Sequence, residues 1–566
     1  MTRYLITSAI PYVNGVKHLG NLVGSLLPAD VHARFRRQTD ATVLFICGTD
    51  EHGTPTELSA AAAGQDLPTY CERQHATQAD IYRRFGLSFD YFGRSSSPQN
   101  HALTQHFYRR LDAAGLIEER DVQQVWSPKD GRFLPDRYIV GTCPHCRYEA
   151  RGDQCDGCGT LLDPPDLLDP RSAISGDRDL QIRTSRHLFL CQSRLVERLR
   201  DWLDRRDGWP AWVSSLARSW LTADLRDRCI TRDLAWGVPV PRPGYENKVF
   251  YVWFDAPINY LAATKEWADT LPSERDWRSW WWQARDVRYL QFLGKDNVAF
   301  HAVSFPATLL GSGEPWKTVD VIKGFHWLTY EGSKFSTSQQ RGVFTDAALE
   351  VLPADVWRWW LIANAPEGAD VDFNFRRFAG DTAKDLADVF GNLATRATSF
   401  ACRAFDGCIP VDGEPAAPEL VLGQEIDRRI AVLRGWHESL EFRRAAAETR
   451  ALWVLANGYI QQQAPWATVG TDPARAAVAT RTALNLLAIC AAVSWSIIPT
   501  LANRVLAALG GSPGCPSWPA RPASTLLDGK RGQPVSRIEP LVGKLSAAEI
   551  SHFERRFSGI SNAVTT

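Results

Sequence analysis

The 566-residue chain has an ordinary soluble composition, with 45% hydrophobic and 23% charged residues, and it is long enough for several domains. Lys plus Arg and Asp plus Glu balance at 64 each, which excludes binding of a polyanion through bulk positive charge; such a partner needs a local basic face. The N-terminal segment lacks a secretory signal pattern and the cysteines fit a reducing compartment, so a cytoplasmic protein is expected.

The first 115 residues alternate strand and helix patterns. Strand patterns over 4–10 and 41–53 flank a helical pattern over 19–37, which predicts a βαβ unit and hence a parallel sheet. His18 and Asn21 lie one helical turn apart where the first strand meets the helix, and Gly20 lets a ligand approach the backbone. No Gly-rich phosphate motif is present here, so side chains would contact a phosphate; a helix cap or core histidine is an equally good interpretation of this spacing alone.

Residues 116–230 carry short strand patterns, turn signals and clustered cysteines, which predict an inserted module. The spacing C-x2-C-x8-C-x2-C can close a tetrahedral site that leaves no coordination position for a substrate, so a structural Zn²⁺ is predicted, one per chain. A pair of disulfides is the alternative and is disfavoured in the cytoplasm. The predicted ligands are Cys143, Cys146, Cys155 and Cys158.

The α/β pattern resumes over 231–345, so one sheet is predicted to be split by the insertion. A second polar loop, YEGSKFSTSQQRGVF (330–344), places a lysine among small hydroxyl residues, as a loop that closes over a polyphosphate requires. A plain solvated loop is the simpler interpretation of that stretch alone. After about 350, apolar residues recur at helical spacing, which predicts a helical bundle.

Two further predictions concern the C-terminal third. The most apolar helical stretch, 484–498, is bounded by Arg481 and Pro499 and is judged too short to span a bilayer, so no membrane partner is expected. The Pro/Gly/Ser-rich stretch that starts near 510 predicts an irregular tail over 511–566.

Six collinear stretches resemble the methionyl-tRNA synthetases, a family of class I aminoacyl-tRNA synthetases. They are PYVNGVKHLGN, CGTDEHGTP, FLPDRYIVGTCPHC, TRDLAWGVPVP, YVWFDAPINY and GKDNVAFH, and the resemblance as a whole covers roughly residues 3–500. HLGN and KFSTS resemble the two signatures of the class. The resemblance implies a ligase that activates L-methionine with ATP and Mg²⁺ and transfers it to the 3′ end of tRNA(Met), both initiator and elongator.

The resemblance also implies a domain plan and a fold class. The fold class is α/β, a Rossmann-type parallel sheet split by a zinc-binding insertion and followed by an α-helical anticodon-binding bundle. The implied segments are a catalytic domain in two halves (1–115 and 231–345), a connective insertion (116–230), a stem-contact region (346–385), an anticodon-binding domain (386–510) and a C-terminal tail (511–566). No RNA-binding domain is appended after the bundle, so a monomer is the simplest expectation.

Site residues follow by matching the family's motifs to this sequence. The catalytic residues implied are His18, Asn21, Lys334 and Thr337, and the ATP ligands are His18, Gly20, Asn21, Gly294, Asp296, Lys334 and Thr337. The methionine site implied consists of Ala9, Ile10, Tyr12, Asp50, Arg232, Trp253, Ala256, Pro257, Tyr260, Asn297, His301 and Phe305, with Asp50 holding the α-ammonium group. The anticodon would be read by Asn392, Arg396 and Trp466.

One departure from the family pattern bears on catalysis. Thr337 stands where many relatives carry a second signature lysine, and a lost charge-assisted hydrogen bond would slow activation by roughly 10- to 100-fold unless another cation serves. Arg341 and Lys323 are the candidate replacements. Thr337→Lys is expected to raise the rate of adenylate formation, whereas an unchanged rate would mean that another cation already serves.

Two other functions stay open at this stage. A paralogue could activate methionine or an analogue for a tRNA-independent or a specialised (resistance or starvation) role. The chain has a single methionine, Met1, so a synthetase of this sequence could itself be made during methionine starvation; chance or codon bias is the alternative explanation. A catalytically weak RNA-binding protein is the third interpretation. Retained anticodon residues speak against the paralogue, and retained His18, Asp50, Asp296 and Lys334 speak against the RNA-binding protein.

Overall fold

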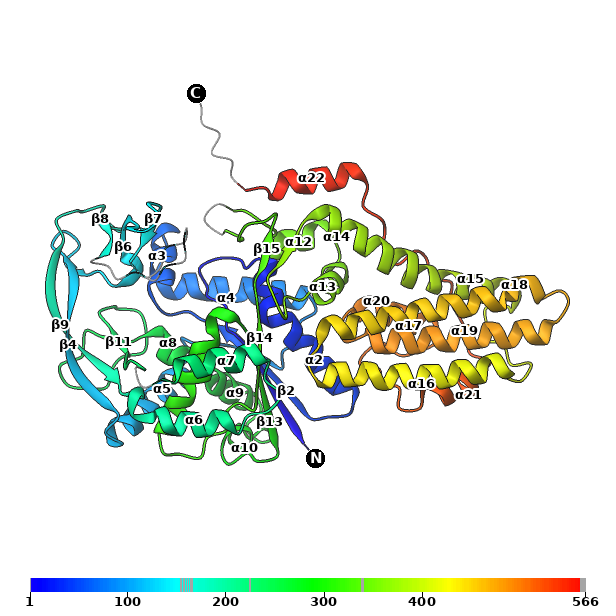
Figure 1. The fold of residues 1–566 in the computed structure, drawn as a ribbon, viewed down its shortest axis with the longest axis horizontal. Coiled ribbons are helices and arrows are strands. Elements are labelled where there is room, and N and C mark those ends of the chain that lie inside the picture. Colours follow the sequence, from blue (N-terminus) through cyan, green and yellow to red (C-terminus); the bar gives the residue numbers. More distant parts are fainter. Residues whose placement is uncertain are drawn as a thin grey trace, which may run out of the picture.

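The protein is an elongated molecule with the α/β body at one end and a helical bundle at the other (Figure 1). The inserted module lies on the side of the α/β body that faces away from the bundle. The structure is a computed structural model, and it describes residues 2–559 apart from 153–154, 156–157, 159, 161, 163–165, 223–224 and 337–339.

The α/β body is built on a five-stranded parallel sheet with the order β14-β13-β1-β2-β3. Strands β1–β3 precede the insertion and β13 and β14 follow it, which confirms the prediction of one sheet split in two. The strand order reverses between β1 and β13, and ligands of such sheets bind beyond the carboxyl ends of the strands at that point. The bounds are β1 Arg3–Ser8, β2 Val43–Thr49, β3 Tyr91–Arg94, β13 Val287–Gly294 and β14 Val321–Phe325.

The predicted βαβ unit is present. Its helix runs as α1 (Leu19–Asn21), η1 (Leu22–Leu26) and α2 (Leu27–Gln38), and η1 is a π-helical turn, a local widening that is frequent at functional sites. Leu5 and Ile6 of β1 are fully buried, so the strand is packed on both faces as a central parallel strand requires. The helices that follow β2 and β3 are α3 Thr54–Ala62, α4 Leu67–Arg84 and α5 Pro98–Ala113.

The insertion contains two small antiparallel sheets. The longer one has the order β10-β9-β4-β5, and the one that carries the cysteines has the order β7-β6-β8. Helices α6 and α7 then lead back to the α/β body. The bounds are β4 Ile117–Ser127, β5 Arg132–Phe133, β6 Ile139–Thr142, β7 Glu149–Arg151, β8 Leu168–Ser172, β9 Gln181–Leu190, α6 Val196–Asp204, α7 Ala211–Trp220 and β10 Arg228–Cys229.

The second half of the α/β body supplies the other wall of the crevice. Helices α8 and α9 follow β12, and a second π-helical turn, η7, lies between β13 and α11. The bounds are β11 Thr231–Arg232, β12 Val249–Phe250, α8 Val252–Asp255, α9 Asn259–Asp269, α10 Arg278–Trp281, η7 Phe300–Ser304, α11 Phe305–Gly311, β15 Leu328–Tyr330, α12 Thr345–Val351 and β16 Val371–Phe373.

The predicted bundle forms the far end of the molecule, where α16, α17 and α19 lie side by side (Figure 1). Helix α13 joins it to the α/β body, because its buried Arg358 donates both to Asp30 of α2 and to the carbonyl oxygen of Ile497. The bounds are α13 Ala354–Ala363, α14 Phe375–Thr382, η8 Ala383–Gly391, α15 Asn392–Ala404, α16 Ala417–Glu438, α17 Phe442–Gln463, α18 Pro465–Thr468, α19 Pro473–Ser494 and α20 Pro499–Ala508.

The apolar helix of the bundle is longer than the sequence suggests. Helix α19 has 22 residues and is long and apolar enough to cross a membrane, but 94% of its most apolar window is buried inside the molecule. Arg481 does not end the helix, because its guanidinium is buried and donates to the carbonyl oxygens of Pro410, Asp412 and Gly413. The prediction of a shorter apolar segment was therefore wrong.

The C-terminal segment differs from the predicted irregular tail, since it contains α21 (Pro522–Asp528) and α22 (Ala547–Phe557). Ser546 and Glu549 form a reciprocal cap at the start of α22, and Phe553 and Phe557 pack on Phe375 of α14. The Pro/Gly-rich composition describes only the connections between these helices.

Candidate active site

A cavity of about 1420 Å³ opens beyond the carboxyl ends of β1 and β13, at the switch point of the sheet. Its lining comes from both halves of the α/β body and from the insertion, so residues far apart in the sequence share one site. All but two of the residues predicted for ATP and methionine line it; Phe305 lies elsewhere, and Thr337 falls outside the described part of the chain.

His18 lies at the start of α1 and caps it. Its Nδ1 accepts from the backbone N–H of Asn21 at 3.4 Å, and Asn21 Oδ1 accepts from the backbone N–H of His18 at 3.3 Å. Burial and the neighbouring Lys17 lower the pKa of His18 to about 3, so its ring is neutral at pH 7. Because Nδ1 accepts, the single proton is on Nε2, which makes the ring a neutral donor. The sequence left a cap and a ligand as alternatives, and this geometry allows both.

Gly20 is required by this arrangement. A Cβ at this position would lie 2.9 Å from His18 Nδ1. Any larger residue would therefore displace the histidine ring.

The signature loop reaches the same cavity. Lys334 and Phe335 both line it, and the Phe335 ring stacks on His18 with centroids 4.5 Å apart. Lys334 Nζ lies 4.4 Å from the centre of the Trp327 ring. Gly342, at φ 103°, lets the loop turn where a Cβ would lie 2.1 Å from Phe335. The loop is thus placed over the helix start that holds His18.

Neither predicted substitute for the second signature lysine lines the cavity. Lys323 is buried on β14, where its Nζ pairs with Glu367 at 2.8 Å. Arg341 donates to the carbonyl oxygens of Tyr330 and Glu331 and so holds the loop backbone. Both cations already have partners inside the fold.

Asp50 is a buried carboxylate that faces the cavity. Its backbone N–H donates to Pro11 O at 2.8 Å and its carbonyl accepts from Val13 N–H at 3.0 Å, which fixes it at the end of β2. Its Oδ1 has no hydrogen-bond partner among the described residues. Burial and the nearby Asp255 raise the pKa of Asp50 well above its usual value. A cationic group of a ligand would satisfy this carboxylate.

Aromatic rings form one wall next to Asp50. Trp253 Nε1 donates to Tyr12 Oη at 3.1 Å and its ring lies 4.4 Å from Phe300. Tyr260 Oη lies 3.0 Å from His301 Nε2, while His301 Nδ1 lies 3.0 Å from the carbonyl oxygen of Asn297. Because a carbonyl only accepts, Nδ1 carries the proton and Nε2 accepts from the tyrosine. The wall is therefore aromatic, with two hydrogen-bonded pairs that fix its rings.

The other residues predicted for substrate binding take the following places. Gly294, the last residue of β13, and Asp296 just after it line the cavity, and burial raises the pKa of Asp296. Arg232 stacks its guanidinium 3.7 Å from the centre of the Tyr251 ring. Phe305 lines a small adjoining pocket together with Cys229 and Trp253, so it supports the wall from behind. The remaining lining residues from the prediction are Ala9, Ile10, Ala256 and Pro257.

Sequence reasoning missed Lys17, which also lines the cavity. Its Nζ donates to Asn14 Oδ1 at 2.6 Å, and it has no acidic partner within 4.0 Å among the described residues. Burial lowers the pKa of Lys17 to about 7, and the Asp50 carboxylate opposes that shift only in part. Its position directly before His18 in the motif was the available signal.

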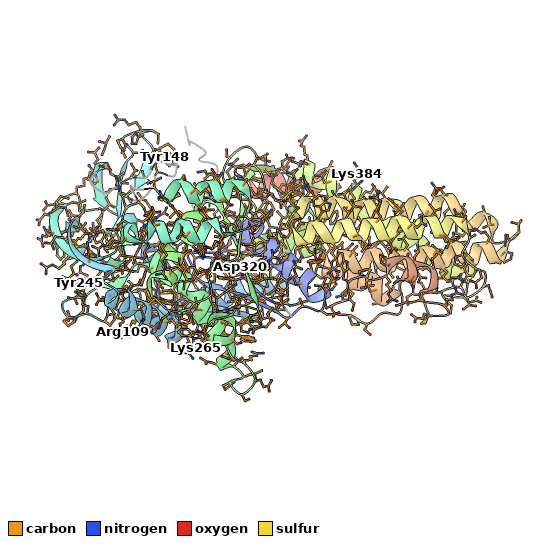
Figure 2. All side chains as sticks on the ribbon, turned by 60° about the horizontal axis from the view of Figure 1, so that its bottom comes forward. Arg109, Tyr148, Tyr245, Lys265, Asp320 and Lys384 are labelled. Carbon is orange, nitrogen blue, oxygen red and sulfur yellow. The ribbon has the colours of Figure 1, made fainter. Side chains whose placement is uncertain are left out.

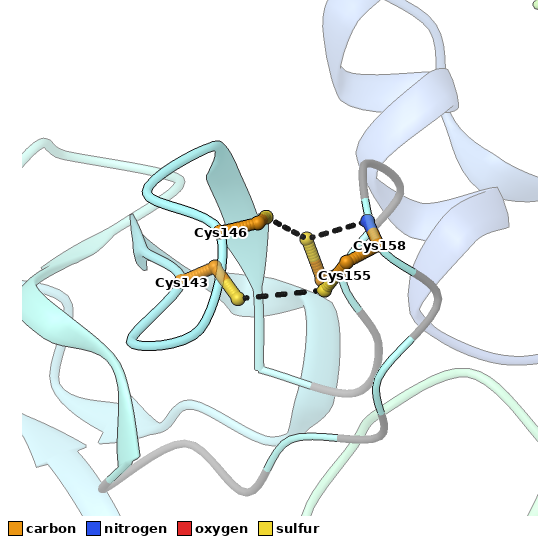
Figure 3. Close-up of side chains that lie close together, drawn as sticks. All are labelled: Cys143, Cys146, Cys155 and Cys158. Carbon is orange, nitrogen blue, oxygen red and sulfur yellow. Dashed lines mark hydrogen bonds between the residues drawn. The ribbon is translucent and has the colours of Figure 1, made fainter.

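The cysteines come together in the insertion (Figure 3). Sγ atoms lie 3.8 Å apart for Cys143 and Cys158 and 3.4 Å apart for Cys146 and Cys155, and all four are free thiols. Four sulfurs around a tetrahedral Zn²⁺ lie about 3.8 Å apart, because each Zn–S bond is about 2.3 Å. The four Sγ atoms lie within 4.8 Å of one another, so this donor set fits a tetrahedral metal ion.

The residues predicted to read an anticodon lie in the bundle. Arg396 of α15 places its guanidinium 4.9 Å from the centre of the Trp466 ring and donates to Gln461 at 2.8 Å. Trp466 is 39% exposed and follows the break between α17 and α18, where Ala464 adopts a left-handed conformation. Asn392 is exposed one turn before Arg396. The break falls at Ala464–Pro465, where the proline lacks the N–H needed to continue the hydrogen bonds of α17.

Comparisons with known proteins agree with this architecture. Residues 4–398 match the profile of "tRNA synthetases class I (M)", and residues 409–562 match that of the "Anticodon binding domain of methionyl tRNA ligase". The split sheet, its two signature segments and the first match define a class I aminoacyl-tRNA synthetase.

Relatives narrow the class. The methionine–tRNA ligase of Caulobacter vibrioides strain NA1000 is 54% identical over 99% of this chain and 100% of that protein, and the one from Streptomyces avermitilis is 51% identical over the same shares. The structure of Mycobacterium tuberculosis methionyl-tRNA synthetase in complex with methionyl-adenylate has the same fold, with a TM-score of 0.76, 24% identity and coverage of 96% of this chain and 99% of that one. The chain belongs to the methionyl-tRNA synthetase family.

Proposed function

We propose that the chain is a methionine–tRNA ligase that forms methionyl-adenylate in the cavity beside β1 and β13 and then transfers methionine to tRNA(Met). In the first step a carboxylate oxygen of methionine attacks the α-phosphorus of ATP, and pyrophosphate leaves. In the second, a ribose hydroxyl at the 3′ end of tRNA attacks the activated carbonyl, and AMP leaves. The observation that carries the proposal is one cavity lined by His18, Asp50 and Lys334, which come from three separate segments.

On the ATP side, donors surround the place where negative charge develops. The neutral His18 ring donates from Nε2 to a phosphoryl oxygen, and the Asn21 amide donates beside it. Lys334 neutralises the departing pyrophosphate, with Thr337 of the same loop taking the second signature position. Gly294 and Asp296 contact the nucleoside, and Mg²⁺ binds with ATP. Donors that act mainly in the transition state raise turnover rather than affinity.

On the methionine side, Asp50 binds the α-ammonium, since its unsatisfied Oδ1 requires a cationic donor. The Tyr12, Trp253 and Tyr260 wall accommodates the thioether side chain, with His301 as its polar element. Homocysteine is one methyl group shorter, and a missing methyl is worth only about 1–3 kcal/mol in such a pocket, so homocysteine is also activated. The ligands predicted from the sequence, including Arg232, Asn297 and the supporting Phe305, complete the site.

The four cysteines hold one structural Zn²⁺ in this proposal. Four thiolates fill a tetrahedral coordination shell, so the metal stabilises the fold of the insertion and takes no part in the chemistry. Metal analysis of purified protein is expected to give one zinc per chain, lost in Cys158→Ser. A zinc-free protein with full activity would contradict the assignment.

The bundle reads the anticodon in this proposal, with Trp466 stacking on an unpaired base and Asn392 and Arg396 contacting base edges. The enzyme works as a monomer in the cytoplasm and charges both initiator and elongator tRNA(Met). Residues 346–385 contact the stem of the tRNA.

The test is a charging assay with both tRNAs, run beside methionine-dependent exchange of pyrophosphate into ATP. Exchange together with charging is expected. Exchange without charging would favour a tRNA-independent paralogue, and the absence of both would contradict the proposal. Neither result depends on the zinc assignment.

A further inference from the structure

We propose that Lys17 is a further cationic ligand of the reaction centre, whose ammonium contacts the α-phosphate of ATP while the methionine carboxylate attacks it. This inference rests on the proposed function. It supplies a positive charge next to His18, in a chain whose second signature position holds Thr337.

The position of Lys17 carries the first step. Lys17 lies in the segment between β1 and α1 and lines the cavity. It directly precedes His18 in the chain, and its ammonium group interacts electrostatically with the Asp50 carboxylate. In the proposed reaction the ammonium of methionine is on Asp50 and the phosphate is on His18. The carboxylate and the α-phosphate therefore meet in the space that Lys17 faces.

The backbone of Lys17 is held rigidly. Its carbonyl oxygen accepts from both the backbone N–H and the Oγ1 of Thr345, each at 2.8 Å, and Thr345 begins α12 directly after the signature loop. The N–H of the next-but-one residue, Leu19, donates to Val343 O at 3.0 Å. A donor that is fixed before the substrate arrives costs little reorganisation when charge develops.

The side chain has an unfilled electrostatic requirement. Lys17 contacts one neutral acceptor, Asn14 Oδ1, and is not in an ion pair within the described part of the chain. Burial without an ion-pair partner disfavours the ammonium form, and an anionic ligand reverses that preference. By contrast, Lys323 and Arg341 have their charges or donors satisfied inside the fold.

Charge balance in the step is simple. The methionine carboxylate oxygen forms a bond to the α-phosphorus, the bond from that phosphorus to the bridging oxygen breaks, and the electron pair leaves with pyrophosphate. Lys17 stays protonated throughout and transfers no proton. Its effect is to stabilise negative charge on the non-bridging oxygens of the α-phosphate, which is larger in the transition state than in bound ATP.

Pyrophosphate exchange by Lys17→Met, Lys17→Arg and a matched control tests this. Lys17→Met keeps the length of the apolar stem and removes the charge, so kcat is expected to fall about 10- to 100-fold. Lys17→Arg keeps the charge and is expected to retain at least a third of the rate. The control, Lys265→Met, removes a lysine of α9 (labelled in Figure 2) whose Nζ pairs with Asp269 at 2.7 Å and which does not line the cavity. Its rate is expected to stay within twofold of the wild type. If Lys17→Met does not fold, Lys17→Gln replaces it.

A second lysine in the signature loop gives an independent measurement. If Lys17 serves the α-phosphate, Thr337→Lys is expected to change the wild-type rate less than threefold but to raise the rate of Lys17→Met at least fivefold. A Lys17→Met enzyme with normal kcat, or one in which only KM for methionine rises, would overturn the inference. A wild-type enzyme without exchange activity would instead contradict the proposed function, so the two failures are distinguishable.

Discussion

Two regions of this protein bury charged side chains and treat them in opposite ways. Where α2 meets α13, Asp30 accepts from Arg34 at 2.9 Å, from Arg358 at 2.7 Å and from the Ser88 backbone at 2.7 Å. Burial opposes ionisation of Asp30, but the two guanidinium groups outweigh it and lower its pKa to about 2. In the cavity, Asp50 is equally buried, lacks a partner for Oδ1 among the described residues, and has a raised pKa.

The difference separates a structural charge from a functional one. The Asp30 cluster is complete, so it holds the bundle on the α/β body and offers nothing to a ligand. Among the described residues, Asp50 Oδ1 has no hydrogen-bond partner and Lys17 has no ion-pair partner. The free energy that their burial costs is offset only when a substrate group of opposite charge binds. Perturbed pKa values alone would flag both regions; only the hydrogen-bond partners tell them apart.

The largest effect is expected from breaking the complete cluster. Arg358→Met leaves the buried Asp30 short of a partner and frees the carbonyl oxygens of Phe85 and Ile497, so stability should fall by about 3–5 kcal/mol. Thermal unfolding measures the loss. Pyrophosphate exchange per folded molecule should stay near the wild-type value, and a stability change below about 1 kcal/mol would contradict the structural role.

Removing a charge from the cavity should have the opposite effect and lower activity rather than stability. Asp50→Asn keeps the shape of the side chain but removes the charge that binds the α-ammonium group. Transition-state stabilisation should therefore fall by about 3 kcal/mol, which lowers kcat/KM for methionine roughly 100-fold. Steady-state exchange kinetics check this. Retention of more than a third of the wild-type kcat/KM would remove Asp50 from the amino acid site.

A third region, the surface of the bundle around Trp466, sharpens the comparison because its charged residue, Arg396, is only partly buried. Trp466→Ala should lower kcat/KM for tRNA, because the stacking on a base that is lost is worth about 1–3 kcal/mol. Methionine-dependent exchange should not change, since the residue lies on the bundle and outside the catalytic cavity. Equal losses in both assays would instead indicate a packing role, for instance against Phe400.

The smallest effect concerns a buried histidine that packs against α2. His437 stacks on Phe35 at 4.7 Å, and burial lowers its pKa to about 3 from the usual 6.5. The unfolded chain binds the proton more readily, so its contribution is complete above pH 6.5 and is lost as the pH falls. Between pH 6.5 and 5 this amounts to about 1.6 kcal/mol. His437→Leu should flatten the pH dependence of thermal unfolding over that interval; an unchanged slope would contradict the assignment.

The sequence predicted the elements that local patterns determine. The strand at 4–10, the helix at 19–37 and the cysteine spacing each depend on residues close together in the chain, and the structure has all three in place. The tail was predicted poorly, because α22 depends on Phe553 and Phe557 packing against a distant phenylalanine, Phe375. Composition does not report such contacts.

The same difference between local patterns and contacts of distant residues explains which parts of the site the sequence predicted. Almost all of the residues that motif matching predicted line the cavity, but the motifs could not tell that Lys323 is paired with Glu367 or that Phe305 lines an adjoining pocket. Nor could they tell that Lys17 lines the cavity without an ion-pair partner among the described residues. These facts depend on which side chains meet in three dimensions. The family pattern assigned a role to the position of Thr337 but none to Lys17, which directly precedes His18.

The most direct test of the difference between structural and functional buried charges is the melting temperature of the wild type and Asp50→Asn, each measured with and without saturating L-methionine. Without methionine, the variant should melt at or above the wild type, because it no longer buries an unsatisfied carboxylate. With methionine, the wild type should rise above the variant, which should hardly respond. If Asp50→Asn melts well below the wild type without ligand, the carboxylate is part of the fold and the account of the cavity is wrong.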